Sequence, residues 1–288
     1  MIGDLLEDAC VVFVKDIADE YNLYLDHKHP RDARGGQREV RWSDIDGNVH
    51  KLDIVLEEGG SEYEFGSPRA FIEIAWRRYT KHSKNKAQEI AGAILPLVDK
   101  YSSLAPFYGT VIAGVFTELS IKQLVSEGFN VIYLDYQSLR KVFSNNGIDI
   151  VWEEDTSDFE LQEKVNQFEA LSSEKRDKII RDLINTNGEQ FSEFANKLRK
   201  SLDRRVSRLL ITPIFGSKSL FYSYEDALSF LESFDDSHVS GDFIRYEIRV
   251  EYTNGDYVDS SFNEKSTATM FVRSLSFSSL KKGETSLM

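Results

Sequence analysis

Cysteine is nearly absent from this sequence. Cys10 is the only one among 288 residues, so an intramolecular disulfide and a cysteine-based zinc site are both excluded. The chain also has no basic-then-apolar leader, and no apolar run approaches the roughly 18 residues that span a bilayer. These features predict a soluble, cytoplasmic protein without a membrane partner. Cys10 itself lies on the apolar face of a predicted helix and is expected in the core rather than as a nucleophile.

Several common catalytic motifs are absent as well. The sequence has no GxxxxGK[ST] phosphate loop, no GxSxG nucleophile elbow and no GxGxxG dinucleotide fingerprint. The formal net charge is −13, which argues against nonspecific coating of nucleic acid because the average field repels phosphate. Any nucleic-acid binding would therefore depend on local basic clusters, such as the five lysines and arginines from Arg77 to Lys86.

The first half of the chain alternates helix-like and strand-like segments. The expected elements are a helix at 2–20, an exposed polar loop at 26–37, hairpin strands at 39–42 and 48–56, a third strand at 71–76 and a helix after Ser83. Two further strands follow, each separated by a helix. Antiparallel strands followed by helical crossovers favour an α/β domain over residues 1–155, with a mixed sheet flanked by helices.

The second half has a different pattern. Residues 156–207 are strongly charged with helical periodicity, which predicts a helical connector. Residues 208–288 contain two successive strand–strand–helix patterns, the second with a hairpin turn predicted at Asn254-Gly255. We therefore expect a C-terminal α+β module of two ββα units that serves recognition or dimerisation.

Two acidic residues interrupt apolar strands of the first domain. Asp53 lies in the predicted strand 48–56, and Glu73 lies in the predicted strand 71–76. Burying a carboxylate costs several kcal/mol unless it is paired or bound to a cation. Two carboxylates directed at one point, with lysines nearby, would suit a divalent metal that faces a phosphate. The alternatives are that Asp53 faces solvent on an edge strand and that Glu73 pairs with Arg77 or Arg78.

This order of elements, with Asp53 on the second strand, Glu73 on the third and a basic helix next, resembles the PD-(D/E)xK nuclease superfamily. That superfamily includes restriction endonucleases and Holliday-junction resolvases. The resemblance covers residues 1–155 and implies a restriction-endonuclease-like sheet, DNA as substrate, and Mg²⁺, or Mn²⁺ in its place, held by Asp53 and Glu73. It implies nothing about the C-terminal module.

Two positions depart from the superfamily pattern. Leu52 stands where the motif has proline, and Ala75 stands where it has the catalytic lysine. Some branches of the superfamily move a catalytic residue from that strand to the following helix. The resemblance therefore implies that Lys86 takes the catalytic role, with Lys84 as the alternative.

Two more acids belong to the expected site. Glu89 lies three residues after Lys86 and hence on the same helical face, where it would add a carboxylate or a supporting hydrogen bond. Glu7 matches a position on the first helix where several branches of the superfamily place another metal-binding acid. The alternative for Glu7 is a solvated residue on an early helical turn.

Histidines offer a rival metal site. His27, His29 and His50 lie near the expected site in sequence, and the pair in His27-Lys28-His29 could ligate a transition metal. Their spacing of two in a loop lacks the fixed helical geometry of a zinc hydrolase motif, and a third ligand would have to come from elsewhere.

Three functions are compatible with these features. The first is a metal-dependent DNA endonuclease of restriction or phage defence, acting as a homodimer or with a partner protein of a defence system, because cutting both strands needs two sites. The second is a catalytically inactive nuclease-like domain that binds nucleic acid or a protein, with Ala75 marking the loss of chemistry. The third is an interaction protein whose function resides in the C-terminal ββα units.

Overall fold

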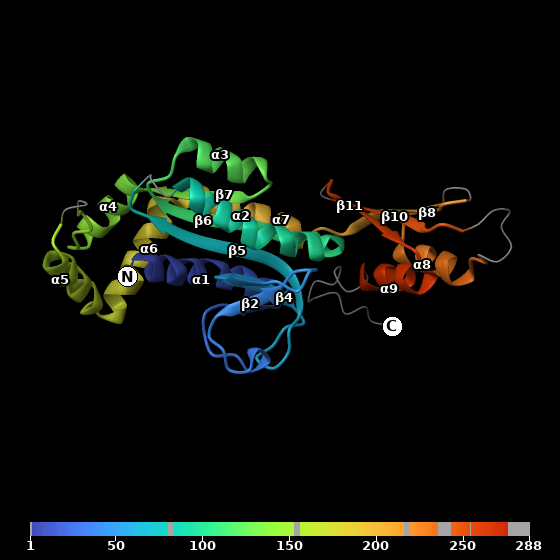
Figure 1. Cartoon of the computed structure of the whole chain (residues 1–288), viewed down its shortest axis with the longest axis horizontal. Helices are drawn as coiled ribbons and strands as arrows, with labels where there is room; N and C mark the ends of the chain where they lie inside the picture. The colour runs from blue at the N-terminus through green and yellow to red at the C-terminus, as the bar shows by residue number, and fades with distance from the viewer. Residues whose placement is uncertain are drawn as a thin grey trace. The chain divides into compact units, whose positions relative to one another are not determined.

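The computed structural model describes residues 2–79, 83–152, 156–215, 219–235, 243–253 and 255–275 (Figure 1). Contacts between residues divide the chain into two compact units. The first unit consists of residues 1–100 and 106–198, and the second consists of residues 101–105 and 199–288.

A mixed five-stranded sheet forms the centre of the first unit. Its strand order is β1-β4-β5-β6-β7. The pairs β1–β4 and β4–β5 are antiparallel, and the pairs β5–β6 and β6–β7 are parallel. The strands are β1 (Leu23–Asp26), β4 (Ile54–Glu58), β5 (Ser67–Arg77), β6 (Phe107–Gly114) and β7 (Asn130–Asp135). A separate hairpin is formed by β2 (Val40–Ser43) and β3 (Val49–Leu52).

Helices flank this sheet. They are α1 (Ile2–Glu20), α2 (Ser83–Lys100), α3 (Glu118–Ser126), α4 (Tyr136–Asn145), α5 (Asp158–Glu169), α6 (Ser173–Thr186) and α7 (Gly188–Leu202). α1 packs on β1, β5 and α6, whereas α2 packs on β5, β6 and α3; in Figure 1, α1 lies below β5 and α2 above it. The predicted α/β class, with a mixed sheet flanked by helices, is confirmed. None of the helices in the described ranges combines the length and apolar character needed to cross a bilayer.

The helical segment after residue 156, which was expected to form a connector, is shared between the two units. α6 packs on α1 and α4, and the ring of Phe13 in α1 lies 4.8 Å from that of Phe191 and 6.1 Å from that of Phe194 in α7. Residues up to Leu198 therefore belong to the first unit. The expected boundary at 155 lies outside the described residues.

The predicted strand 48–56 is broken at Asp53. β3 ends at Leu52 in the small hairpin, and β4 begins at Ile54 in the main sheet, so Asp53 occupies the bend between two sheets. The short strand β1 was not predicted, because its four residues show no alternation of buried and exposed positions. It lies at the edge of the sheet, paired with β4.

The stretch 26–37 was expected to be an exposed loop, and this prediction is wrong for its arginines. The Arg31 side chain is fully buried, with Nη1 2.6 Å from Glu57 Oε1 and 2.8 Å from Asp26 Oδ2. It also donates to the backbone oxygens of Ser61, at 2.7 Å, and Glu64, at 2.8 Å. Arg34 is buried beside it and pairs with Asp26. The polar composition of this stretch reflects paired charges inside the protein rather than solvation.

The second unit contains a four-stranded antiparallel sheet of order β11-β10-β8-β9. Its elements are the 3₁₀ helix η3 (Ser102–Leu104), β8 (Val206–Pro213), β9 (Ser219–Phe221), α8 (Tyr224–Ser233), β10 (Tyr246–Tyr252), β11 (Tyr257–Phe262) and α9 (Lys265–Leu275). Two successive strand–strand–helix units are present, as the sequence pattern indicated. Asn254 of the predicted turn lies outside the described residues.

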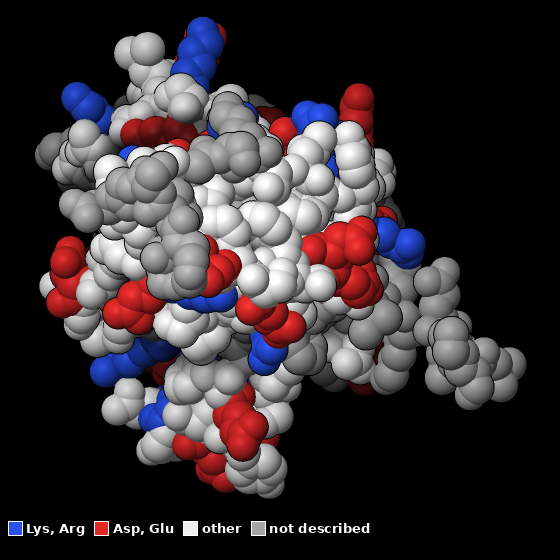
Figure 2. Space-filling model, turned by 90° about the vertical axis from the view of Figure 1, so that its right-hand side faces the viewer, with Lys and Arg blue, Asp and Glu red and all other residues white. Residues whose placement is uncertain are grey.

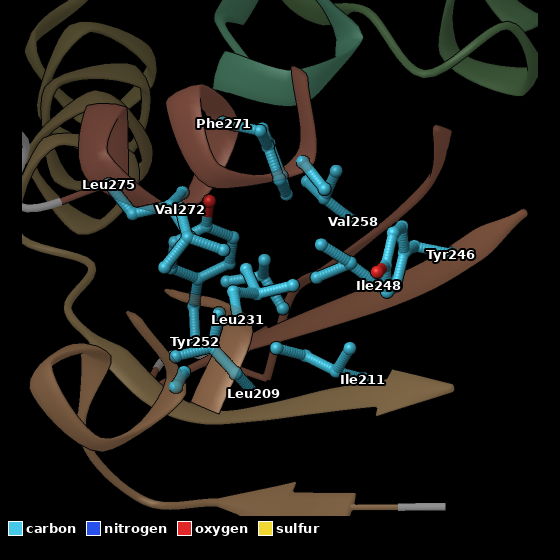
Figure 3. Packing of buried hydrophobic residues seen from close by; sticks show 13 residues of the cluster. Leu209, Ile211, Leu231, Tyr246, Ile248, Tyr252, Val258, Phe271, Val272 and Leu275 are labelled. Carbon is cyan, nitrogen blue, oxygen red and sulfur yellow. The ribbon is translucent and has the colours of Figure 1, made fainter. Parts of the chain in front are cut away.

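Alternation along the strands builds the core of this second unit. Every second residue is buried along β10 and, from Leu209 onward, along β8, including Leu209, Ile211, Ile248 and Val250. These side chains pack together with Phe271 and other residues of α8 and α9 (Figure 3). The period of two in the strands therefore directs one face of the sheet toward the helices.

Arg31→Leu tests the buried charge network. Removing the guanidinium leaves Glu57 buried without its cationic partner and leaves Asp26 with Arg34 alone, so we expect the free energy of unfolding to fall by about 3–5 kcal/mol. Chemical denaturation measures it. Arg41→Leu is the control, because Arg41 pairs with Glu39 at the surface of the same unit and should cost at most about 1 kcal/mol. If the two variants lost the same free energy of unfolding, the buried pairs of Arg31 would contribute no more to stability than a surface pair.

Candidate metal and phosphate site

The antiparallel pairing of β4 and β5 brings Asp53 and Glu73 together. Ile54 pairs with Ile72, so Asp53, just before Ile54, and Glu73, just after Ile72, adjoin the same end of the pairing. The backbone N–H of Ile74 donates to Asp53 Oδ2 at 2.7 Å, which fixes the aspartate against β5. The structure thus places the two predicted carboxylates side by side.

Burial raises the pKa of both carboxyl groups. The pKa of Glu73 lies well above its ordinary value, first because the side chain is buried and second because of the Asp53 charge, while Lys86 opposes the shift. Burial also raises the pKa of Asp53, against the hydrogen bond from Ile74 and the charges of Lys86 and Lys28. Each carboxyl group is therefore more readily neutralised than an exposed one, by a proton or by a cation.

One oxygen of this pair has no partner within the protein. Glu73 is only 7% exposed, yet its Oε1 makes no hydrogen bond to any residue that the structure describes. A buried acceptor without a partner costs free energy that a bound cation or an ordered water would recover. A carboxylate oxygen is also the donor that a hard divalent cation prefers. The residues present therefore fit Mg²⁺ or Mn²⁺.

Lys86 is the lysine that α2 brings to the carboxylates. Its side chain is only 20% exposed, and its charge favours the ionised forms of both Asp53 and Glu73. Lys84 is exposed on the same helix and is not among the main charges that shift either pKa. Ala75, two residues beyond Glu73 on the same face of β5, is buried. A cation thus reaches the pair from the helix instead of from the strand.

The two additional acids lie at different distances from the pair. Glu7 of α1 is close enough for its charge to raise the pKa of Glu73, and burial followed by the Asp53 charge raises the pKa of Glu7 itself. Glu89 is largely exposed and lies 3.5 Å from Lys86 Nζ and 3.7 Å from Arg77 Nη2. Glu89 therefore contacts the lysine of the site rather than its carboxylates.

Sequence reasoning missed Lys28 as a member of this site. Its Nζ lies 3.9 Å from Glu7 Oε2, and its charge lowers the pKa of both Glu7 and Asp53. No local pattern could have identified it, since its position depends on how the segment after β1 folds back over α1. The site thus includes a cation from α2 and another from this segment.

The histidines make other contacts. His50 Nε2 lies 2.8 Å from Asp44 Oδ2, and His29 lies 3.2 Å from the Tyr24 hydroxyl and 3.4 Å from Glu62. Across the described residues, no group of three or more His, Cys, Asp or Glu side chains is arranged to hold a metal. This disfavours the rival histidine site, and it leaves Asp53 and Glu73 as a two-carboxylate site without a third protein ligand. Cys10 is buried in the core, as predicted.

Charge elsewhere on the molecule is mixed. On the face shown in Figure 2, acidic and basic side chains surround a broad area without charge, and the described residues there form no continuous basic surface. With a net charge of −13, attraction of a polyanion would have to come from a few well-placed cations.

Comparisons with known proteins give no name to this arrangement. No family model and no curated protein matches the chain. One solved structure, titled "Crystal Structure of Protein of Unknown Function AF1548", is 12% identical and superposes with a TM-score of 0.31 over 68% of this chain and 92% of its own. A likeness this weak carries no conclusion about fold or function.

Glu73→Gln should stabilise the metal-free protein at neutral pH. A carboxyl group whose pKa is higher in the folded than in the unfolded chain contributes fully to stability below its unfolded pKa. That contribution is lost as the pH rises through the folded-state pKa. Glutamine has no proton to lose, so in EDTA the variant should gain stability relative to wild type on going from acidic to neutral pH. Denaturant unfolding at several pH values measures the difference.

The control is Glu118→Gln, because Glu118 is exposed on α3 and pairs with Lys122 one turn further along the same helix. This variant should follow wild type at every pH. Parallel stability curves for wild type and Glu73→Gln would show that Glu73 titrates like an exposed acid.

Proposed function

We propose that the first unit is a metal-dependent DNA endonuclease with the restriction-endonuclease-like fold of the PD-(D/E)xK superfamily. The observation that carries the proposal is the buried oxygen of Glu73, which has no hydrogen-bond partner among the described residues and lies next to Asp53, where the Lys86 charge acts on both carboxyl groups. Two buried carboxylates with one lysine leave an excess of negative charge, which is a costly way to stabilise a fold. They suit the transient binding of a cation and a phosphate.

Asp53 and Glu73 would hold Mg²⁺ or Mn²⁺ through their carboxylate oxygens. Mg²⁺ commonly takes one or two carboxylates and completes its shell with water and substrate phosphate, so a third protein ligand is not required. Once bound, the metal ion supplies Lewis acidity, which lowers the pKa of water and neutralises charge on the phosphate.

The protein's own groups orient the reaction. Ile74 N–H fixes the rotamer of Asp53, and the pairing of β4 with β5 places Glu73 next to it. Lys86 carries a positive charge beside both carboxylates, where it stabilises the attacking hydroxide and the additional negative charge on the phosphorane-like transition state. The attacking water loses a proton to solvent and adds to phosphorus, and one ester P–O bond breaks. The leaving alkoxide takes up a proton from solvent, so that the products are a phosphate monoester and an alcohol.

The second candidate is a nuclease-like domain without chemistry. It is favoured by one observation, the buried Ala75 where the superfamily has its lysine. Such a domain would bind nucleic acid or a protein and would not cut. The proximity of Lys86 to both carboxylates favours the active enzyme, and the assay below separates the two.

Cleavage of plasmid and linear DNA with Mg²⁺, Mn²⁺ or EDTA is the direct test. Asp53→Asn and Glu73→Gln keep the size of each side chain but remove its charge, and each should abolish metal-dependent cleavage. Lys86→Ala should lower the rate by at least about tenfold, as expected for loss of one electrostatic contact to the transition state. Asp19→Asn on the exposed surface of α1 should cut at the wild-type rate. Cutting by Glu73→Gln at that rate would refute the site.

Metal binding can be measured without activity. A ligand at free concentration c that binds only the folded state stabilises it by RT ln(1 + c/Kd) and so raises the melting temperature as c exceeds Kd. Mg²⁺ or Mn²⁺ should therefore raise the melting temperature of wild type and of Asp19→Asn, but not of Glu73→Gln. The same rise for all three proteins would mean that the metal binds elsewhere.

A further inference from the structure

Lys28 projects from a segment whose backbone is held in place by buried arginines. Arg34 Nη2 donates to the backbone oxygen of His29 at 2.6 Å, one residue beyond Lys28. Arg31 fastens the same segment to Glu57 of β4 and to the 61–64 turn. The backbone at Lys28 is thus held in place, and its side chain extends to Glu7 on an early turn of α1.

The arginine network is more extensive than an ordinary surface loop requires. Arg31 is fully buried, and all of its polar nitrogens donate hydrogen bonds, to Glu57 and to two backbone oxygens. Burying such a cluster costs desolvation free energy that apolar packing would not, so it contributes a defined geometry more than net stability. The arginines therefore fix the position of the backbone from which the Lys28 side chain extends.

The ion pair that Lys28 makes is loose. Nζ lies 3.9 Å from Glu7, and the Lys28 side chain is 56% exposed. A solvent-exposed lysine in a pair of this length contributes little to stability, so exchanging Glu7 for another anion costs little. The ammonium is therefore available to a more highly charged partner that approaches the carboxylate site from solvent.

The charges of Lys28 and Lys86 act on the same carboxylate from different elements, while the two side chains pair with Glu7 and Glu89. Lys86 comes from α2, Lys28 from the segment after β1, and both charges act on Asp53. An anion that binds at Asp53 through a metal ion would therefore meet one cation from each element. A polyanion with phosphates on both sides of the bound one fits such a pair better than a single small anion does.

We propose that Lys28 contacts a DNA phosphate next to the one held at Asp53 and Glu73, with Arg31 and Arg34 as positioning residues for its loop. This inference rests on the proposed function. Lys28 leaves Glu7 when DNA binds, and the released Glu7 remains beside the site. The contact is electrostatic, so it contributes to affinity for any sequence.

The salt dependence of DNA binding tests this contact. Each phosphate neutralised by a lysine adds about 0.9 to the slope of log affinity against log salt on duplex DNA. In protein with Glu73 and Asp53 intact and with Ca²⁺ in place of Mg²⁺, which takes the same carboxylate oxygens but is a weaker Lewis acid, Lys28→Ala should reduce that slope by about 0.9. Lys28→Arg should keep it. The measurement is fluorescence anisotropy of a short labelled duplex over a series of salt concentrations.

Lys51→Ala is the matched control, because Lys51 is also an exposed lysine of the first unit, 2.7 Å from its partner Glu39. It should leave the slope unchanged. If Lys28→Ala behaves like Lys51→Ala while the wild-type protein cuts DNA, the Lys28 contact is refuted and the nuclease stands. If the wild type does not cut but Lys28→Ala still lowers the slope, the nuclease is refuted and the phosphate contact stands. Absence of measurable DNA binding would overturn the Lys28 contact.

Discussion

The first unit depends on the burial of two carboxyl groups at one point of its sheet. Asp53 and Glu73 would each be less costly as apolar residues, because burial raises the pKa of both. The hydrogen bond from Ile74 and the Lys86 charge offset only part of this cost. Something else must neutralise the pair, and a proton or a divalent cation can do so. The local geometry, including the break between β3 and β4, serves to bring these two groups together.

The same unit contains a second cluster of buried charge that is balanced differently. Around Arg31 and Arg34, two guanidinium groups face Asp26 and Glu57, and backbone oxygens accept from the remaining nitrogens. The positive and negative charges are matched there, and the arginines hold the backbone at His29 and in the 61–64 turn in place. Asp26 Oδ2 and Glu73 Oε1 both lack a hydrogen bond from a described residue, but Asp26 Oδ2 lies 2.8 Å from Arg31 Nη1, whereas no described cation lies that close to Glu73 Oε1. The first cluster therefore holds the chain path, and the second is the one to which the proposed function gives a ligand.

Features governed by local sequence were predictable. The helical periodicity of residues 2–20 matches α1, and the alternation in the C-terminal strands matches the order of the two ββα units. Asp53 and Glu73 could be selected because each interrupts an apolar segment. Features that depend on distant partners were not predictable. Arg31 is buried only because Glu57 and the carbonyls of the 61–64 turn lie around it. Lys28 joins the site for the same reason, since nothing in its immediate neighbours signals Glu7.

The helical segment after residue 156 shows the same limit. Its charge density is typical of a solvated connector, yet a few apolar side chains, such as Ile179 and Phe191, are buried against the first unit. The periodicity of these residues was visible in the sequence, but their partner was not. A hydrophobic stripe predicts that a helix will be covered without identifying the surface that covers it.

Charge at the site links the two ligands of the proposed enzyme. Asp53, Glu73 and Glu7 together outnumber Lys28 and Lys86, and the chain as a whole is acidic, so an approaching phosphate meets a net negative centre. A divalent cation between Asp53 and Glu73 reverses that balance locally. Because linkage is reciprocal, DNA must then strengthen metal binding by the same factor by which metal strengthens DNA binding. The two lysines are too few to hold DNA alone, which makes the metal ion a condition for engaging DNA as well as for cutting it.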